Sequence, residues 1–391
     1  MTHFGDLANE IYLRGLAGKR PDLPMTADGL EAAARDVLPA EAFSYVAGGA
    51  STERTITANR AAFARWRIVP RMLRGITHRD LSTTVLGTSM SAPVLTAPIG
   101  ALGLVHPDAD LAVTRVAAAL GLTSVLSTVS SATLEDVAAA APESGRWFQL
   151  YWPRDPELAE SLVKRAEAAG YRAIVLTVDT WALGWRPRDL QLGHLPFLRG
   201  TGLANYLSDP VFRARLIAPP EESAQAMQMA IRRCLELFGN PALSWEDLAL
   251  LRQWTRLPVL VKGVCHPDDA RAALDHGVEA LVVSNHGGRQ VDGARAALDC
   301  LPDVVAAVDG RAAVLLDSGI RCGADVLIAL ALGAQAVLLG RPWVYGLGLA
   351  GQRGVEHVLR VVLGDLDLTL ALAGYARSTE LRMHSVVQEV G

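Results

Sequence analysis

The chain has 391 residues, half of them hydrophobic, and a formal net charge of −4. This length allows two or three domains, or one large barrel. The charge is low and no Lys/Arg block stands out, which argues against nucleic acid or an anionic membrane surface as a partner.

Three features of the sequence bear on the cellular compartment of the protein, namely its first residues, its apolar runs and its cysteines. Residues 1–24 have no apolar core behind a basic start, so we expect no signal peptide. The longest apolar run, at 324–340, is short for a membrane span and contains Asp325 and Gln335, so we expect a buried helix followed by a buried strand. The four cysteines are scattered, without a CxxC pair or a nearby His at zinc spacing. We therefore expect a reduced, cytoplasmic protein with no metal site and no membrane partner.

Residues 1–92 form a predicted N-terminal extension. It contains a helix at 27–37 and the segment AEAFSYVAGGASTERT at 40–55, which precedes the first predicted strand. From there a repeating pattern begins, in which a short apolar run and a turn are followed by an Ala/Leu-rich amphipathic stretch. Short apolar runs bounded by turns are typical of strands buried on both faces, as in parallel sheets.

Eight such runs occur along the chain, at 93–98, 123–127, 147–151, 173–179, 258–263, 280–286, 313–317 and 336–340. Helical stretches lie between them, for example at 108–121, 155–170, 266–277 and 323–333, and several open with Asp or Pro and close with Gly. Eight regular βα units predict an α/β protein with a closed (β/α)8 TIM barrel. A doubly wound open sheet is the alternative, but it seldom contains eight regular units.

The whole chain, 1–391, is predicted to be a single domain. We place the barrel at 93–345, with a long loop at 185–245 after the fourth strand, and C-terminal helices at 346–391. A loop of this length is typical of a lid, a binding loop or an interface.

Polar side chains end seven of the eight predicted strands, which is where the active sites of barrels lie. The first strand ends in Pro98, Ile99 and Gly100. The polar ends of the others are Ser127, Gln149 with Tyr151, Thr177 with Asp179, Lys262, Ser284 with His286, Asp317, and Gly340 with Arg341.

The turns after strands seven and eight, DSGIRCG at 317–323 and LGRPW at 339–343, predict an anion site. Both contain glycine and one arginine, Arg321 and Arg341. Backbone N–H groups of such turns and of a helix start bind phosphate, and a guanidinium adds charged donors. The alternative is that each arginine caps a helix or pairs on the surface. GLGLAG at 346–351 matches GxGxxG but opens no Rossmann unit, and we treat it as chance.

The loop SNHGGRQVDG at 284–293 combines a candidate base with a candidate carboxylate clamp. His286 suits general base catalysis, and Arg289 can hold a carboxylate through two hydrogen bonds. Arg186 is a second clamp candidate, and Asp179 at the same strand end could orient His286. Lys262 could stabilise negative charge on a cofactor. The alternatives are a buried histidine in a tight turn and a buried salt bridge at the lysine.

These motifs together resemble the FMN-dependent 2-hydroxy acid oxidases and dehydrogenases, such as glycolate oxidase and lactate oxidase. The resemblance covers about 27–385, and its most specific parts are SNHGGRQVDG, PVLVKGV, LTVDT, WFQLY, DSGIR and LGRP. The segments NEIYLRGLAG, FSYVAGGA, WRPRDLQLG and GLANYLSDPVFRARL look most like the lactate 2-monooxygenase branch.

The resemblance implies a role for each matching residue. His286 corresponds to the base, Asp179 to the carboxylate that orients it, and Lys262 to the lysine at the N1/C2 edge of the flavin. Substrate would be bound by Arg186, Arg289, Tyr45 and Tyr151. The flavin ring would be contacted by Pro98, Ile99, Gly100, Ser127, Gln149, Thr177 and Ser284, and the ribityl phosphate by Asp317, Ser318, Gly319, Arg321, Gly340 and Arg341.

The implied activity is oxidation of an L-2-hydroxy acid to the 2-keto acid, with oxygen as the acceptor and with oxidative decarboxylation as a subtype. Three alternatives stay open: another electron acceptor, a flavin-free barrel isomerase or aldolase, and a non-catalytic scaffold. The resemblance also implies a homo-oligomer, a tetramer or octamer. Val129 and Ile99 depart from the family pattern, and together with Trp152, Trp181 and Leu203 they are expected to shape the pocket for the substrate side chain.

Overall fold

The computed structural model describes residues 3–389 and contains a closed parallel barrel. All eight predicted runs form its strands, so the predicted (β/α)8 barrel is confirmed, and the open doubly wound sheet is excluded. Around the closed circle each strand pairs with its neighbours in chain order, and the last strand pairs with the first. The strands are β4 (Val94–Thr96), β5 (Thr123–Ser127), β6 (Arg146–Leu150), β7 (Ile174–Thr177), β8 (Val259–Val264), β9 (Ala280–Val283), β10 (Ala313–Leu316) and β11 (Ala336–Leu339).

Alternation along the strands determines what fills the barrel. Leu95, Val125, Trp147, Val175 and Leu260 form an interior cluster, whereas their chain neighbours pack outward against the helices. Because side chains on a strand alternate with period two, the residue two positions further along each strand also faces the barrel interior. The covering helices are α5 (Ala109–Ala119), α6 (Leu134–Ala140), α7 (Pro156–Ala168), α13 (Pro267–Asp275), α14 (Ala297–Val308), α15 (Gly323–Ala331) and α16 (Arg341–Leu372).

The N-terminal extension contains more structure than the sequence indicated. The predicted helix at 27–37 is confirmed as α2 (Ala27–Val37), where Thr26 caps the first turn by accepting from Gly29 N. A hairpin closes the bottom of the barrel, because its Val85 and Met90 join the interior cluster and Thr88 accepts from Nε1 of Trp147. The other elements are α1 (Asp6–Leu16), α3 (Ala40–Ala47), α4 (Arg54–Ala64), β1 (Trp66–Ile68), β2 (Thr83–Val85) and β3 (Thr88–Met90).

We expected a long loop at 185–245, but this segment forms a series of short helices. These helices start at local signals, although the sequence here shows no long apolar periodicity. α8 and α10 have proline in the first turn, and Asp209 and Ser223 cap α10 and α11 with their side chains. We call residues 185–245 the insert. The helices of the connection from β7 to β8 are α8 (Pro187–Leu192), α9 (Ala204–Ser208), α10 (Pro210–Arg213), α11 (Ala224–Leu237) and α12 (Leu248–Trp254).

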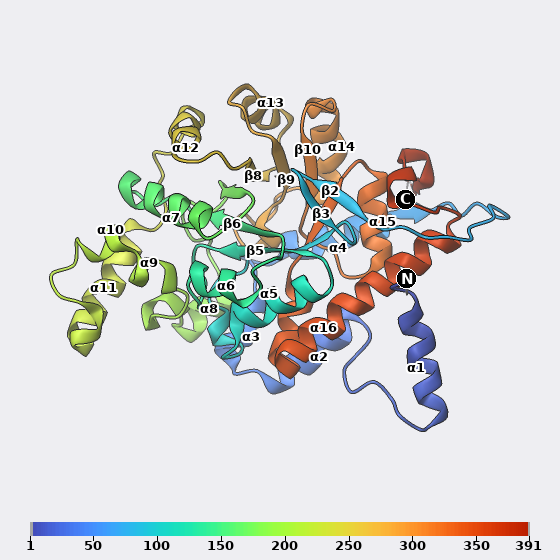
Figure 1. Ribbon diagram of the computed structural model, residues 1–391, viewed down its shortest axis with the longest axis horizontal. Coiled ribbons are helices and arrows are strands. Elements are labelled where there is room, and N and C mark those ends of the chain that lie inside the picture. Colours follow the sequence, from blue (N-terminus) through green and yellow to red (C-terminus); the bar gives the residue numbers. More distant parts are fainter. Residues whose placement is uncertain (1–2, 390–391) are drawn as a thin grey trace.

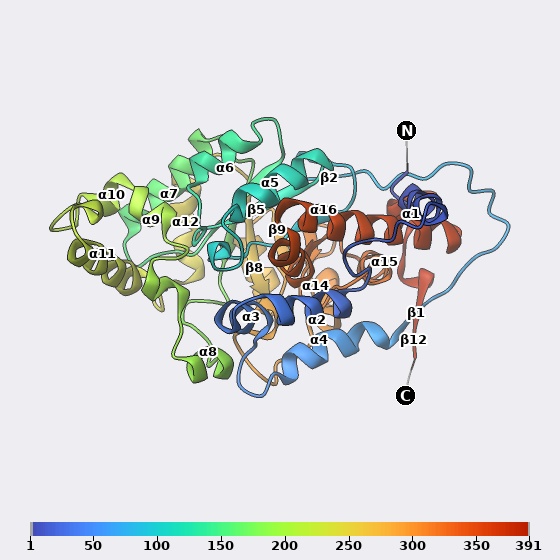
Figure 2. The same cartoon turned by 90° about the horizontal axis from the view of Figure 1, so that it is seen from below.

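The prediction of helices at 346–391 was wrong at both ends. α16 begins at Arg341 and bends at Ala350 and Gly351, and the chain ends in β12 (Val386–Gln388), which pairs antiparallel with β1. That strand is too short and its partner too distant in sequence to give a local signal. The insert lies at one end of the molecule, and both described chain ends lie at the other (Figures 1 and 2).

The apolar run at 324–340 forms α15 followed by β11, as expected for a buried helix and a buried strand. Within 3–389, no helix combines the length and the apolar character that crossing a membrane requires. All four cysteines are free thiols.

Candidate active site

A cavity lies at the carboxyl ends of the barrel strands and encloses about 990 Å3, its opening included. It brings together most of the residues predicted from the sequence. Those that line it are Tyr45, Pro98, Ile99, Gly100, Tyr151, Arg186, Lys262, His286, Arg289, Asp317, Ser318, Gly319, Arg321, Gly340 and Arg341.

The remaining predicted residues do not line the cavity but support it. Ser127, Gln149, Thr177 and Ser284 continue the inward-facing positions of their strands, so they form a buried polar layer above the apolar interior. Ser127 Oγ donates to Gln149 Oε1 at 3.1 Å. Within 3–389, Nε2 of Gln149 and Oγ1 of Thr177 are buried and have no hydrogen-bond partner. An unpaired buried polar atom is costly, so this layer is suited to a polar ligand above it.

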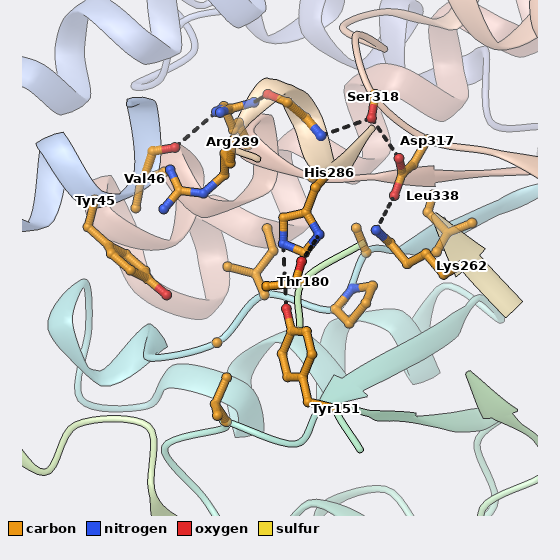
Figure 3. Close-up of a pocket in the computed structure, with 18 of the residues that line it drawn as sticks. Tyr45, Val46, Tyr151, Thr180, Lys262, His286, Arg289, Asp317, Ser318 and Leu338 are labelled. Carbon is orange, nitrogen blue, oxygen red and sulfur yellow. Dashed lines mark hydrogen bonds and ion pairs between the residues drawn. The ribbon is translucent and has the colours of Figure 1, made fainter. Parts of the chain in front are cut away.

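His286 is held in the cavity by its own loop and by Asp179. His286 has φ +57, and Gly287 and Gly288 follow in the same left-handed region. At Gly288 any side chain would also collide with the backbone of Ile56, so the turn requires glycine there. The imidazole Nδ1 lies 2.7 Å from Oδ1 of Asp179. Nε2 lies 3.5 Å from the hydroxyl of Tyr151 (Figure 3).

Burial and charge set the protonation of this pair. Burial alone would raise the pKa of the Asp179 carboxyl, but His286 and Lys262 outweigh it and lower the pKa to about 2. Burial lowers the pKa of His286 below its ordinary value, against the opposing attraction of Asp179. Asp179 is therefore an anion at neutral pH, and His286 is a neutral imidazole whose Nε2 is free to accept a proton.

A second chain of contacts runs from Lys262 through Asp317 and Ser318 to the loop that carries His286 (Figure 3). Nζ of Lys262 lies 3.1 Å from Oδ2 of Asp317 and donates to Ser284 Oγ at 3.0 Å. Burial alone would lower the pKa of Lys262, but Asp317 and Asp179 raise it, so the ammonium stays charged. Asp317 accepts from Ser318 Oγ, which in turn accepts from the N–H of Gly287. The salt bridge considered from the sequence is present, and it leaves a buried cation at the cavity wall.

Two guanidinium groups meet at the mouth. Arg186 donates to the carbonyl of Arg289 and to Oε1 of Gln290, and Arg289 donates to the carbonyl of Gly48. Among residues 3–389, no carboxylate forms a salt bridge with Arg186 or Arg289 in this structure. Burial and the neighbouring Arg186 lower the pKa of Arg289 to about 9, so it remains a cation that an anionic ligand would stabilise.

The predicted phosphate region is built around the start of α16. Gly340 precedes this helix without a side-chain cap, and a Cβ there would make only ordinary van der Waals contact with Ile99 and Ala97. Arg341 lines the region but already donates to the carbonyls of Val46, Gly48 and Gly287, so it also ties three segments together. Burial lowers the pKa of Arg341 to about 10 and that of Arg321 in the same direction. The free helix N-terminus and these cations form a site suited to phosphate.

The prediction of which residues line the pocket for the substrate side chain was partly wrong. Val129 and Ile99 line the cavity, but Trp152, Trp181 and Leu203 do not. Trp152 and Trp181 instead line a separate cavity, which shares Tyr151 with the first. The insert and the loop before it supply Leu183, Phe197 and Phe238 instead.

Sequence reasoning also missed two polar residues that shape the site. Thr180 Oγ1 donates to Asp179 Oδ1 at 2.7 Å and lies 2.9 Å from Nδ1 of His286. Gln290 donates to the carbonyls of Asp179 and Ala182, so it joins the loops after β7 and β9. Both follow predicted site residues directly in the sequence, which was the available signal. In the part of the chain that the structure describes, no group of three His, Cys, Asp or Glu side chains could hold a metal ion.

Comparison with known proteins agrees with this geometry. The profile described as FMN-dependent dehydrogenase matches residues 34–388. The chain is 43% identical over 391 residues to an L-lactate oxidase of Lysinibacillus sphaericus, covering 100% of this chain and 99% of that protein. It is 42% identical over 346 residues to a 4-hydroxymandelate oxidase of Amycolatopsis orientalis, covering 88% and 93%. The crystal structure of mandelate oxidase with (S)-4-hydroxymandelic acid superimposes with a TM-score of 0.83 at 39% identity, covering 94% and 99%. The chain therefore belongs to the FMN-dependent dehydrogenase family.

Proposed function

We propose that this protein oxidises an L-2-hydroxy acid to the 2-keto acid with FMN as its cofactor. The observation that carries the proposal is the convergence of the His286 imidazole and the Arg186 and Arg289 guanidiniums on one cavity. Two adjacent guanidiniums suit a carboxylate, and a neutral imidazole suits proton removal from the neighbouring carbon or its hydroxyl. Relatives named for lactate and 4-hydroxymandelate support this reading, because both acids carry a 2-hydroxyl group.

The residues at the barrel mouth fit FMN. The unpaired Gln149 Nε2 and Thr177 Oγ1 offer a buried amide and a hydroxyl to the polar edge of a flavin ring, and the free N-terminus of α16 suits the phosphate. FMN supplies a two-electron acceptor when it is bound. We propose that Pro98, Ile99, Gly100, Ser127, Gln149, Thr177, Lys262 and Ser284 hold the ring, and that Asp317, Ser318, Gly319, Arg321, Gly340 and Arg341 hold the ribityl phosphate.

The protein groups divide the remaining work. Arg186 and Arg289 bind the substrate carboxylate, with the hydroxyls of Tyr45 and Tyr151 as further donors. His286 accepts one proton at Nε2, and Asp179 stabilises the imidazolium that results, because it lies 2.7 Å from Nδ1. Lys262 remains cationic and stabilises negative charge that develops at the cofactor edge. Fixing the carboxylate on two arginines also fixes the orientation of the reacting C–H.

Oxygen is the acceptor that we propose, because similar proteins are named as oxidases. The likeness to the lactate 2-monooxygenase branch stays a prediction, as does the alternative of a non-oxygen acceptor. Association into a tetramer or octamer and a cytoplasmic location also stay predictions. The flavin-free isomerase or aldolase considered from the sequence is set aside, because the family to which the chain belongs depends on FMN.

The decisive experiment mixes the purified yellow protein anaerobically with a panel of 2-hydroxy acids while the flavin absorbance is followed. We expect bleaching with at least one L-acid and none with its D-enantiomer. Readmitting oxygen and measuring peroxide against CO2 then separates an oxidase from a monooxygenase. A flavin that stays oxidised with every 2-hydroxy acid would contradict the proposed function.

His286→Ala tests the base within the same assay. We expect this variant to retain FMN, because the imidazole is assigned to the substrate, and to lose nearly all flavin reduction. Reduction at the wild-type rate would remove His286 from the mechanism. Absence of flavin reduction in both proteins would instead favour the scaffold alternative.

A further inference from the structure

Four aromatic rings form a continuous row along one wall of the cavity. The rings of Tyr45 and Phe197 lie 6.4 Å apart and edge to face, those of Phe197 and Phe238 lie 6.2 Å apart and nearly parallel, and those of Phe238 and Tyr151 lie 5.3 Å apart and edge to face. All four residues line the cavity. The two tyrosines at the ends of the row are the proposed substrate donors, so the two phenylalanines lie between the groups that would bind substrate.

The phenylalanine pair comes from the insert and is fixed there. Phe197 is 5% exposed and lies in a short helical turn (Pro196–Arg199) that begins with proline. Phe238 is the C-cap residue directly after α11, and its N–H donates to the carbonyl of Cys234. The next residue, Gly239, has φ +76 and lies so close to the carbonyl of Trp181 that a side chain would not fit. The insert backbone therefore fixes both rings against the cavity.

The proposed carboxylate clamp lies at the Tyr45 end of this aromatic row. The cations Arg186 and Arg289 lie beside Tyr45, with the guanidinium of Arg289 5.0 Å from its ring centre. The same cavity is also lined by the apolar side chains of Leu183, Val129 and Ile99. A molecule whose carboxylate binds the arginines would therefore place its other end against carbon atoms.

We propose that Phe197 and Phe238 form the subsite for the substrate side chain, and that the protein favours 2-hydroxy acids with an aromatic side chain. This inference rests on the proposed function and extends it to a substrate class. Aromatic rings favour offset or edge-to-face contacts with other rings, which a methyl group cannot make. A second carboxylate on the side chain would be buried against the phenylalanines without a partner, so dicarboxylic 2-hydroxy acids are disfavoured.

The test compares L-lactate, L-3-phenyllactate and L-malate as reductants of the holoenzyme flavin, without oxygen. We expect the rate constant for flavin reduction, divided by the substrate dissociation constant, to be higher for phenyllactate than for lactate by about tenfold or more, which is the scale on which apolar pockets discriminate. Malate should give the lowest value of the three. Pyruvate and phenylpyruvate are also titrated into the oxidised holoenzyme by calorimetry, which measures binding without turnover. We expect phenylpyruvate to bind more tightly than pyruvate.

Phe197→Leu and Phe238→Leu remove a ring but keep an apolar side chain. We expect both to lower the phenyllactate-to-lactate ratio and the phenylpyruvate-to-pyruvate binding ratio toward one. Phe212→Leu is the matched control, because Phe212 lies in the same insert, packs edge to face on Tyr206 at 5.9 Å, and does not line the cavity. It should leave both ratios unchanged.

The outcomes separate this inference from the function on which it rests. Equal or better use of lactate by the wild type, or an undiminished aromatic preference in both cavity variants, would overturn the subsite. Loss of the preference in Phe212→Leu as well would overturn it too, because general packing of the insert would then explain the effect. If no acid reduces the wild-type flavin, the proposed function fails, and the keto acid titrations alone decide whether the rings select aromatic ligands.

Discussion

Oδ1 of Asp179 lies 2.7 Å from Nδ1 of His286, so the carboxylate determines which imidazole nitrogen faces the cavity. The bonded nitrogen must carry the proton when His286 is neutral, since the carboxylate can only accept. Nε2, on the side of Tyr151, is then the basic atom. One contact thus defines both the tautomer of the base and its direction.

Asp179→Asn should break this arrangement while preserving its shape. An amide can donate to Nδ1, which favours the tautomer with its proton on Nε2, and it no longer stabilises the imidazolium. We expect flavin reduction to slow by about 10²- to 10⁴-fold, the usual contribution of general acid–base catalysis, with FMN content unchanged by absorbance. A variant that is reduced at the wild-type rate would show that Asp179 does not act through His286.

Thr180 gives a test based on pH. Catalysis requires neutral His286, so kcat/KM should fall as pH drops through the pKa of His286, which burial holds below 6.5. Thr180→Val removes a donor to Asp179, leaving more negative charge directed at the imidazole, so the pKa of His286 and the acid limb of the profile should move to higher pH. Thr180→Ser keeps the hydroxyl and should keep the wild-type profile. An unmoved acid limb in Thr180→Val would mean that the hydroxyl has no influence on the base.

Arg289→Lys should weaken carboxylate binding although the charge is kept. A lysine ammonium lacks the planar pair of donors and cannot reach the Gly48 carbonyl in the same geometry. We expect the dissociation constant for pyruvate to rise by about 10- to 100-fold, the cost of one charged hydrogen bond, when titrated into the oxidised holoenzyme. Wild-type affinity in this variant would place the carboxylate elsewhere.

Asp110 should make stability depend on pH. It is buried beneath the loop after β5 and accepts from the N–H groups of Ser131 and Ala132, yet burial raises its pKa from 3.8 to about 6. The folded state therefore holds this proton more tightly than the unfolded state. Its contribution to stability is present below about pH 4 and is lost as pH rises through 6, by up to about 3 kcal/mol.

Asp110→Asn has no charge to lose and can accept the same two bonds through its amide oxygen. In urea unfolding, we expect the stability of this variant relative to the wild type to increase between pH 4 and pH 7. A constant difference across that range would show that Asp110 titrates alike in the folded and unfolded chains.

The barrel and much of its site could be predicted because both follow from short-range rules. Strands buried on two faces give unbroken apolar runs, and period-two alternation carries Gln149, Thr177 and Lys262 inward at the strand ends. Their assembly into one layer then follows from closure of the barrel. The roles taken from the family resemblance, such as the flavin contacts, stay predictions that the orphaned atoms of Gln149 and Thr177 support.

What could not be predicted depends on contacts between distant segments. Nothing near Trp152 or Trp181 shows that the insert folds so that Phe197 and Phe238 reach the cavity instead. Helix α1 has no side-chain cap and buries none of its residues, so its sequence lacks a capping signal and a core-facing apolar stripe. β12 has three residues, and its strand partner β1 lies at the other end of the chain.

The hydrogen bonds of Arg341 have a consequence for engineering. Its guanidinium reaches from the last barrel strand to carbonyls at Val46 and Gly48, in the segment that also supplies Tyr45. A fragment that starts at β4 would keep all eight strands yet lose that segment. Chimeras between relatives should therefore exchange residues 40–64 and the barrel as a single cassette, since a crossover between them would pair one parent's arginine with another parent's acceptors.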